Sequence, residues 1–426
     1  MLINKNFFSK INILNYLISS IPLSLIIGNL ATNLNIILIC LTGLWLFGRE
    51  LFFVEKKINY LLCLFFIYLI IITTVNNYVL LNKNELYLDH IFKSFFFLRF
   101  LLLFLIINKL IEKNHFNTKI FYISCAFFSL IVAIDITIQF IFKYNILGNP
   151  IVNNKPSGFF KEENIAGGFL QKFILFFIFL TAFKKKGKNY YILIIGLSIL
   201  CFLPILFTAN RMPTILFIFS IILYFLLEKK LKHLFLILII LIAILFSSTK
   251  IIISERLHMD TRAFISDSVN IISSAPRLFI YNNLDNELSW GSGYLTHFNS
   301  GVQQWKQNKI FGKGLKSFRL NCSYAKNQTC NTHPHNYFIE LMVDTGLIGL
   351  TLIYSIFLIG LKKFIKFYFN EMNTNIKLTT IVFFLLIFCE FFPIRSTGSF
   401  FTTNNATFIF LILPIFLNFK KIQKLD

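Results

Sequence analysis

The stretch YYILIIGLSILCFLPILFT, residues 190–208, contains nineteen residues and no charged side chain. An apolar helix of this length is long enough to cross the hydrocarbon core of a lipid bilayer. Lysines 184–186 and Lys188 precede it, and the polar turn TANR, residues 208–211, closes it. The stretch therefore predicts a transmembrane helix with a basic end and a polar end.

Comparable apolar runs recur along the chain. Of its 426 residues 56% are hydrophobic, 17% are aromatic and only 14% are charged, and the mean hydropathy is +0.70. A soluble chain of this length would need far more polar surface. We predict an all-α, polytopic membrane helical bundle of about twelve transmembrane helices, at residues 11–29, 34–54, 58–76, 91–111, 120–142, 164–183, 190–208, 212–228, 232–248, 336–361, 378–394 and 402–419.

The basic residues alternate between successive connections. One set of connections carries 22 Lys and Arg, the short connections of the other set carry 6, and the long connection 249–335 carries 10. Basic residues mark the cytoplasmic side, whereas long loops are translocated largely regardless of charge. We therefore expect cytoplasmic termini and an external long connection. Most of the formal charge of +22 then reflects topology, which argues against nucleic acid as a partner.

The predicted topology divides the chain into three parts. Residues 1–248 form transmembrane helices 1–9, residues 249–335 form a long external loop, and residues 336–426 form helices 10–12. The first apolar stretch is not followed by a small-residue cleavage site, so we expect it to be retained as a span.

Four polar stretches fall on the same predicted external side. They are KPSGFFKEENIAGG (155–168), TANR (208–211), the end of the long connection with THPHN (332–336), and FPIRSTGSFF (392–401). Their convergence at one membrane boundary predicts a functional site there, to which the long loop contributes.

His333 and His335 flank Pro334 just before an apolar helix. A neutral imidazole can take a proton from a hydroxyl group and act as a general base. Two other interpretations stay open. The pair could bind a metal ion with His297 or His258 as third ligand, or it could be a structural pair that caps the helix.

Asn336, Glu340 and Asp344 are spaced i, i+4, i+8 in the following helix. This spacing places them on one face, and such polar groups face the bundle interior or a wet cavity rather than lipid. The alternative is a polar packing contact between helices.

Arginine is rare, with 8 Arg against 33 Lys. Arg211 lies in the tight turn FTANRMP, where a charge at the membrane boundary needs a partner. A planar guanidinium suits bidentate recognition of phosphate better than lysine does. Arg256, Arg262 and Arg277 fit ordinary external surface charge.

Seven cysteines divide between two environments. Cys322 and Cys330 lie in the external loop, where an oxidising compartment would allow a disulfide between them. The other five lie in predicted spans and fit small apolar packing residues.

The order of these stretches resembles the O-antigen ligase/polymerase family of bacterial membrane proteins. The resemblance covers roughly residues 90–418. It rests on five stretches: SGFFKEENIAGGFL, FTANRMP, KQNKIFGKGLKSFR (306–319), THPHNYFIELMVDTGLIGL (332–350) and STGSFF (396–401). One departure stands out: many members have an arginine four residues before a tryptophan in the long loop, and here Gly301 precedes Trp305.

The resemblance implies a metal-independent glycosyltransferase of GT-C type without a cofactor. It would act at the periplasmic face of the bacterial inner membrane and move a glycan from undecaprenyl diphosphate to an acceptor hydroxyl. The acceptor is lipid A core in ligases, another carrier-linked repeat unit in polymerases, and a protein in protein O-oligosaccharyltransferases.

The resemblance also implies roles for individual residues. His335 would be the base, with His333 as a second catalytic residue, and Arg211 would bind the donor diphosphate. Arg319 and Lys316 would be further diphosphate contacts. Three residues would support the site: Asn336, Glu340 and Glu163.

A transporter for a lipid-linked glycan is the alternative from a different class. Such a protein is expected to show related halves with broken helices at the membrane centre. The sequence shows no such internal symmetry, and its polar residues gather at one boundary.

Overall fold

The computed structural model describes residues 5–52, 57–80, 87–152, 155–161, 163–182, 188–228, 293–321, 331–371, 373–393, 395–396 and 398–421. The predicted span 232–248, most of the long connection and the pair Cys322 and Cys330 lie outside these ranges. The other five cysteines are free thiols, and the burial of Cys40, Cys125, Cys201 and Cys389 agrees with a packing role, whereas Cys63 is only half-buried.

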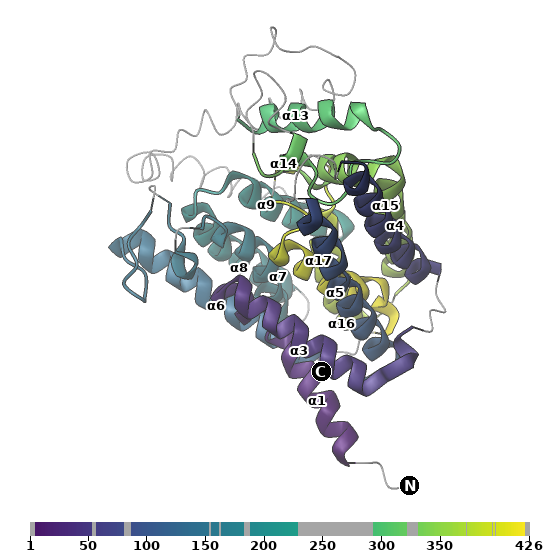
Figure 1. Cartoon of the computed structure of the whole chain (residues 1–426). Helices are drawn as coiled ribbons and strands as arrows, with labels where there is room; N and C mark the ends of the chain where they lie inside the picture. Colours follow the sequence, from purple (N-terminus) through teal and green to yellow (C-terminus); the bar gives the residue numbers. More distant parts are fainter. Residues whose placement is uncertain are drawn as a thin grey trace.

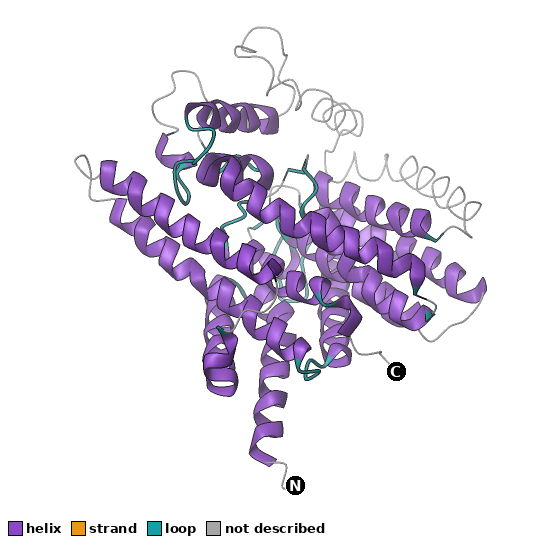
Figure 2. Cartoon of the chain, turned by 90° about the vertical axis from the view of Figure 1, so that its right-hand side faces the viewer, coloured by secondary structure: helices purple, strands orange, loops and turns teal. Residues whose placement is uncertain are grey.

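Helices account for almost all of the regular structure, and the described ranges contain no strand (Figures 1 and 2). The helices are α1 (Lys5–Ser19), α2 (Ile21–Ile27), α3 (Asn29–Phe47), α4 (Lys57–Leu80), α5 (Tyr87–Glu112), α6 (Thr118–Phe142), α7 (Ala166–Ala182), α8 (Lys188–Phe207), α9 (Arg211–Leu227), α13 (Gly293–Gln307), α14 (Phe318–Asn321), α15 (Tyr337–Asn370), α16 (Thr374–Glu390) and α17 (Thr403–Leu417). Short 3-10 turns are η1 (Gly48–Leu51), η2 (Gly158–Phe160) and η5 (Phe419–Lys421).

The helices agree with the predicted apolar segments. Each predicted span except 232–248 overlaps a helix. Six helical segments of the described chain are individually long and apolar enough to cross a membrane, and α1 with α2, bent by 45°, would be a seventh. α7, α9 and α17 are apolar but shorter. An all-helical, multi-pass membrane bundle is thus confirmed, whereas the count of twelve stays a prediction.

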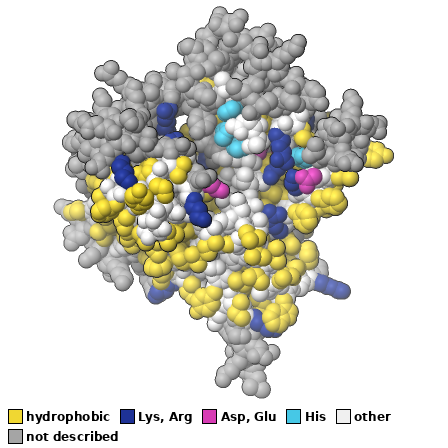
Figure 3. Space-filling view, turned by 60° about the vertical axis from the view of Figure 1, so that its left-hand side comes forward, with side chains coloured by type: hydrophobic (Ala, Val, Ile, Leu, Met, Phe, Trp, Pro, Cys, Tyr) yellow, Lys and Arg dark blue, Asp and Glu magenta, His cyan; other side chains and the backbone are white. Residues whose placement is uncertain are grey.

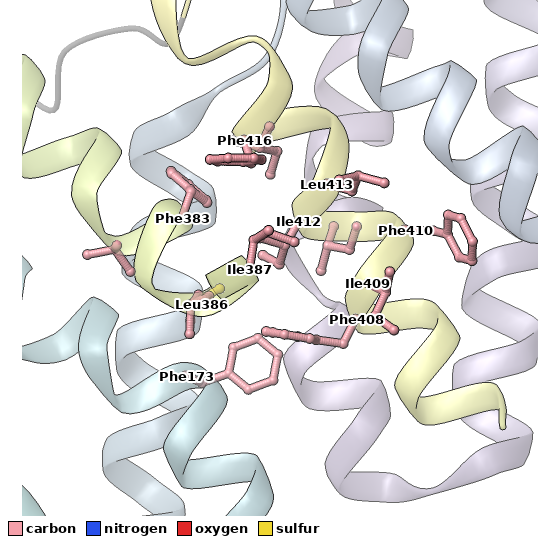
Figure 4. Close-up of a cluster of buried hydrophobic side chains, with 14 of the residues drawn as sticks. Phe173, Phe383, Leu386, Ile387, Phe408, Ile409, Phe410, Ile412, Leu413 and Phe416 are labelled. Carbon is pink, nitrogen blue, oxygen red and sulfur yellow. The ribbon is translucent and has the colours of Figure 1, made fainter. Parts of the chain in front are cut away.

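α17 lies at the centre of the bundle. Every residue from Ala406 to Phe416 is buried, and a helix that is apolar on all sides is stable only when other helices surround it. Phe408 packs edge-to-face on Phe173 of α7 (Figure 4). Phe416 lies against Phe364 of α15. This tightly packed helix gives the polar residues before it, 395–396 and 398–402, a rigid support.

α15 contains a break at Gly346, whose φ of 62° lies in the left-handed region. A side chain there would collide with the carbonyl group of Ile310, so the close approach requires glycine. The amide of Lys313 donates to the Val343 carbonyl at 3.0 Å, and that of Leu347 donates to the Lys309 carbonyl at 3.0 Å. These bonds satisfy the groups freed by the break, and they fix the segment 309–314 on the helix.

The polar stripe on α15 faces the protein interior, as predicted. The Asn336 side chain caps the helix by accepting from Ile339 N at 2.9 Å, and it donates to the Pro393 carbonyl at 2.7 Å. Glu340 accepts from Ser399 Oγ at 2.5 Å and from Phe400 N at 2.6 Å. Both residues thereby hold the segment between α16 and α17.

Asp344 is also fully buried. It accepts hydrogen bonds from Lys316 N at 2.7 Å and from Ser317 N at 3.1 Å. All three members of the stripe therefore bind protein groups, which matches the packing interpretation that the sequence left open.

α13 and α14 lie at one end of the molecule, and α1 lies at the other (Figures 1 and 2). η5, which follows α17, lies near the end of α5, where Lys421 Nζ donates to the Glu112 carbonyl at 3.1 Å. The helix beginnings that carry the predicted polar stretches lie toward α13.

Candidate active site

A cavity of about 800 Å³ lies where the predicted polar stretches meet. Its walls come from residues within 155–161, 163–173, 209–216, 333–335, 395–396 and 398–408, together with Leu25 and Asn29 of the first helices. The volume lies within the usual range for small-molecule sites. The convergence of four segments far apart in the sequence is thus observed in the structure.

Several helix beginnings border this cavity. They belong to α3 at Asn29, to α7 near Gly168, to α9 at Arg211, and to α17 near Asn404 and Asn405. Helix N-termini carry a partial positive charge and free backbone N–H groups, so they attract anions. Together with Arg211, they make this end of the bundle electropositive. Figure 3 shows histidine side chains on this side of the molecule, with Lys and Arg side chains on either side and hydrophobic side chains below.

The loops at the cavity hold strained backbone. Lys161, Ala209 and His335 have φ values of 56°, 53° and 55°, a region that non-glycine residues seldom adopt. Such strain persists only where surrounding contacts enforce it, and it is concentrated at functional sites. For Ala209, one enforcing contact is nearby, since Asn210 Nδ2 donates to the Asn164 carbonyl at 3.2 Å and ties the start of α9 to the start of α7.

Three histidines gather at the cavity. The ring centres of His333 and His335 are 4.1 Å apart, and those of His335 and His297 are 5.2 Å apart. The Asn331 amide nitrogen lies 2.7 Å from His335 Nε2 and 3.5 Å from His297 Nε2. Asn331 therefore orients the ring of His335. Across the residues that the structure describes, no group of three His, Cys, Asp or Glu is placed to hold a metal ion.

His333 is an electrically neutral member of this cluster at neutral pH. Its Nδ1 lies 2.9 Å from Thr332 Oγ1, and its Nε2 is buried with no hydrogen-bond partner among the described residues. Burial, together with the positive potential of His335, His297 and Lys316, lowers the pKa of His333 to about 4. The imidazole is thus kept as an uncharged neighbour of His335.

Acidification is expected to destabilise the protein through His333. An unfolded chain binds a proton on this residue near pH 6.5, whereas the folded chain does so only near its pKa of about 4. Stability therefore falls as pH drops between these values. We expect His333→Asn to lose less thermal stability than the unmodified protein between about pH 6.5 and pH 4.5, measured by thermal unfolding of the purified protein. Equal losses in both proteins would contradict the buried neutral state.

A buried ionic cluster lies beside the histidines. Arg395 Nη1 is 2.6 Å from Glu390 Oε2, and Lys172 Nζ is 3.4 Å from Glu390 Oε1. The side chains of Lys172, Glu390 and Arg395 are only 11%, 1% and 6% exposed. Tyr337 OH also donates to Glu390 Oε1, at 3.0 Å. Lys172 and Arg395 line the cavity, whereas Glu390 lies behind them.

Sequence reasoning did not assign this cluster to the site. A signal was present, because Lys172 is one of three basic residues inside the predicted spans and Glu390 is an acid inside another. A charge at that depth requires a partner. The sequence does not show which acid accompanies which base.

The residues predicted for the site fall into three groups. Arg211, His333, His335 and the exposed Glu163 line the cavity. Asn336 and Glu340 lie behind it and hold the segment that carries Arg395.

Lys316 and Arg319 form the third group and do not line the cavity. Lys316 is half-buried, and its positive charge helps to lower the pKa of His333. Arg319 is exposed, and its charge interacts electrostatically with Asp89 and His90 near the start of α5.

Gly301, the departure from the family pattern, lies on α13 against the start of α15. A Cβ atom there would meet the Ile339 side chain and would lie 3.1 Å from Pro334 Cβ. The close packing of these two segments leaves no room for an arginine at this position.

The match with known families covers the central part of the chain. The search of curated proteins found no match to this chain. The family model described as O-antigen ligase matches residues 196–354, a range that contains Arg211, His333 and His335 and runs from α8 into α15. Over these residues, the chain is similar to the O-antigen ligase family.

Proposed function

We propose that the protein moves a glycan from undecaprenyl diphosphate onto an acceptor hydroxyl of lipid A core, at the periplasmic face of the bacterial inner membrane. The match of residues 196–354 to the O-antigen ligase family model supports a glycan-transferring activity of ligase type on a lipid-linked glycan and a glycan acceptor. The observation that carries the proposal is the single cavity that holds His335, His333 and Arg211.

His335 acts as the general base. Its ring lines the cavity, and Nε2 is its accepting nitrogen, since the Asn331 amide lies 2.7 Å from it. The acceptor hydroxyl takes the place of that amide and gives its proton to Nε2 as the oxygen attacks the anomeric carbon. His333 is the second catalytic residue: its neutral ring beside His335 keeps positive charge away from the base before the reaction. Glu163 also lines the cavity and is available to the sugar hydroxyls.

Arg211 stabilises the leaving group. The bond between the anomeric carbon and the phosphate oxygen breaks, and the electron pair leaves with the diphosphate. Negative charge on the phosphate oxygens grows in that step, and a guanidinium at the N-terminus of α9 is placed to neutralise it. Fixed cations and helix N-termini supply this charge, so the step requires no metal ion.

Asn336 and Glu340 support the site indirectly. Asn336 Nδ2 donates to the carbonyl of Arg395 at 2.9 Å, and Glu340 binds Ser399 and Phe400. They fix the segment before α17 relative to the histidines at the start of α15. Of the two further cations predicted with Arg211, Lys316 is the one whose charge helps to lower the pKa of His333.

The glycolipids of a strain without this gene test the function. For a ligase, we expect lipid A core without long glycan chains, together with carrier-linked polymer that accumulates. For a polymerase, which the same site geometry would also serve, the core would carry a single repeat unit. Gel separation of the extracted glycolipids distinguishes these results, and an unchanged ladder would exclude both activities.

A further inference from the structure

Lys172 lies in an unusual electrostatic position. Glu390 is closely paired with Arg395, at 2.6 Å, and Lys172 is held at the longer distance of 3.4 Å from the same carboxylate. The other contacts of Lys172 are neutral: its Nζ donates to Asn405 Oδ1 at 2.9 Å and lies 4.7 Å from the ring centre of Phe408. One carboxylate is therefore shared between two cations.

This arrangement leaves excess positive charge beside the cavity. Burial of two cations with a single carboxylate costs free energy, because the cations lose their hydration and only part of their charge is neutralised. A bound anion would neutralise the rest. Lys172 and Arg395 both line the cavity, so an anion that occupies it can reach them. The cluster is thus suited to a negatively charged group of the substrate.

The cations are also held in place before any substrate binds. Arg395 Nη1 donates to the Cys389 carbonyl at 3.1 Å in addition to Glu390, and Asn405 fixes Lys172. Asn405 in turn donates to the Ser399 carbonyl at 2.9 Å. Preorganised cations bind an anion without first losing side-chain entropy.

We propose that Lys172, with Arg395 beside it, is the second cation of the diphosphate site in addition to Arg211, and that Glu390 offsets part of its charge. The inference rests on the proposed function, because it names further residues for the same donor. It assigns to α7 and to the segment before α17 the role that the sequence alone placed on Lys316 and Arg319, neither of which lines the cavity. Lys172 would contact the phosphate oxygens, whereas Glu390 would act only through Lys172 and Arg395.

Lys172→Met tests this role because methionine keeps the length of the side chain and removes its charge. We expect the purified full-length variant to bind both farnesyl diphosphate and inorganic pyrophosphate at least about 10-fold more weakly than the unmodified protein, a loss equal to about 1.4 kcal/mol. Lys143→Met is the matched control, since Lys143 is exposed, follows α6 and does not line the cavity. It should bind both probes normally.

Glu390→Gln gives a second test, in which affinity for pyrophosphate should rise rather than fall. This variant removes the shared carboxylate, raises the positive charge beside the cavity, and should bind pyrophosphate several-fold more tightly. A cluster with a purely structural role would instead give unchanged or weaker binding in this variant, and that result would overturn the inference. This measurement also decides the matter if Lys172→Met does not fold.

The two probes distinguish a site for the diphosphate of a lipid carrier from a site for a free anion. A loss for both in Lys172→Met supports a site for the diphosphate of the lipid carrier. A loss for pyrophosphate with normal binding of farnesyl diphosphate would mean that Lys172 holds a free anion, and would refute the inference. Normal binding of both probes would refute it as well.

Binding and transfer are measured separately, so the two proposals can fail independently. If His335→Ala abolishes transfer but Lys172→Met binds both probes normally, only the role of Lys172 is wrong. If Lys172→Met loses diphosphate binding but the unmodified protein transfers no glycan, the anion site stands and the proposed function is wrong.

Discussion

Replacement of His335 by alanine is expected to lower the rate of glycan transfer about 10²- to 10⁴-fold, the range that a general base usually contributes. The acceptor hydroxyl is a weak nucleophile until a base removes its proton. His335 lines the cavity and its ring is oriented by Asn331 at 2.7 Å. The measurement is the initial rate of transfer of a lipid-linked glycan to acceptor by the purified protein.

Binding of farnesyl diphosphate provides the control for this variant. The alanine removes the base but leaves Arg211 and Lys172 in place, so affinity for the diphosphate should stay the same. A variant that transfers at the normal rate would show that His335 is not the base. A variant that loses diphosphate binding and transfer together would place His335 in donor binding instead.

Arg211→Lys is expected to lower the rate of transfer about 10²- to 10³-fold, the loss seen when one donor of an anion-stabilising site is removed. Lysine keeps the positive charge but lacks the planar fork that binds two phosphate oxygens at once. The effect should appear in the chemical step, where the leaving diphosphate gains charge.

Arg49→Lys is a matched control for Arg211→Lys. Arg49 is exposed in η1 and does not line the cavity, so the same exchange there should leave the rate unchanged. Full activity in Arg211→Lys would contradict bidentate binding of the diphosphate, because a point charge would then suffice.

The helices of this protein were predictable from sequence because each one satisfies its own backbone. In a bilayer every N–H and C=O group needs a partner within its segment, so an apolar run of about twenty residues becomes a helix whatever its neighbours are. Each predicted segment in the described chain accordingly overlaps a helix. The break at Gly346 was not predicted, because it depends on the segment 309–314, which replaces the missing partners.

The candidate site was predictable in part for a related reason. Alternation of basic connections places polar stretches on one side of the membrane, so the meeting of Arg211 with His333 and His335 followed from topology and order in the chain. The stripe on α15 was less well determined. A buried polar side chain satisfies the same physical requirement whether it faces a substrate or a backbone amide, and Glu340 faces the amide of Phe400.

Sequence alone therefore determined the class of the protein, its apolar helices, and the end of the bundle where polar groups gather, since these depend on local hydrophobicity and charge. Only the tertiary structure decided which charges share a partner. Lys172 lies on α7 and Glu390 at the end of α16, and nothing in the spacing of either helix identifies the other. Their meeting depends on how α7, α16 and the central α17 pack, because Coulomb attraction acts through space rather than along the chain.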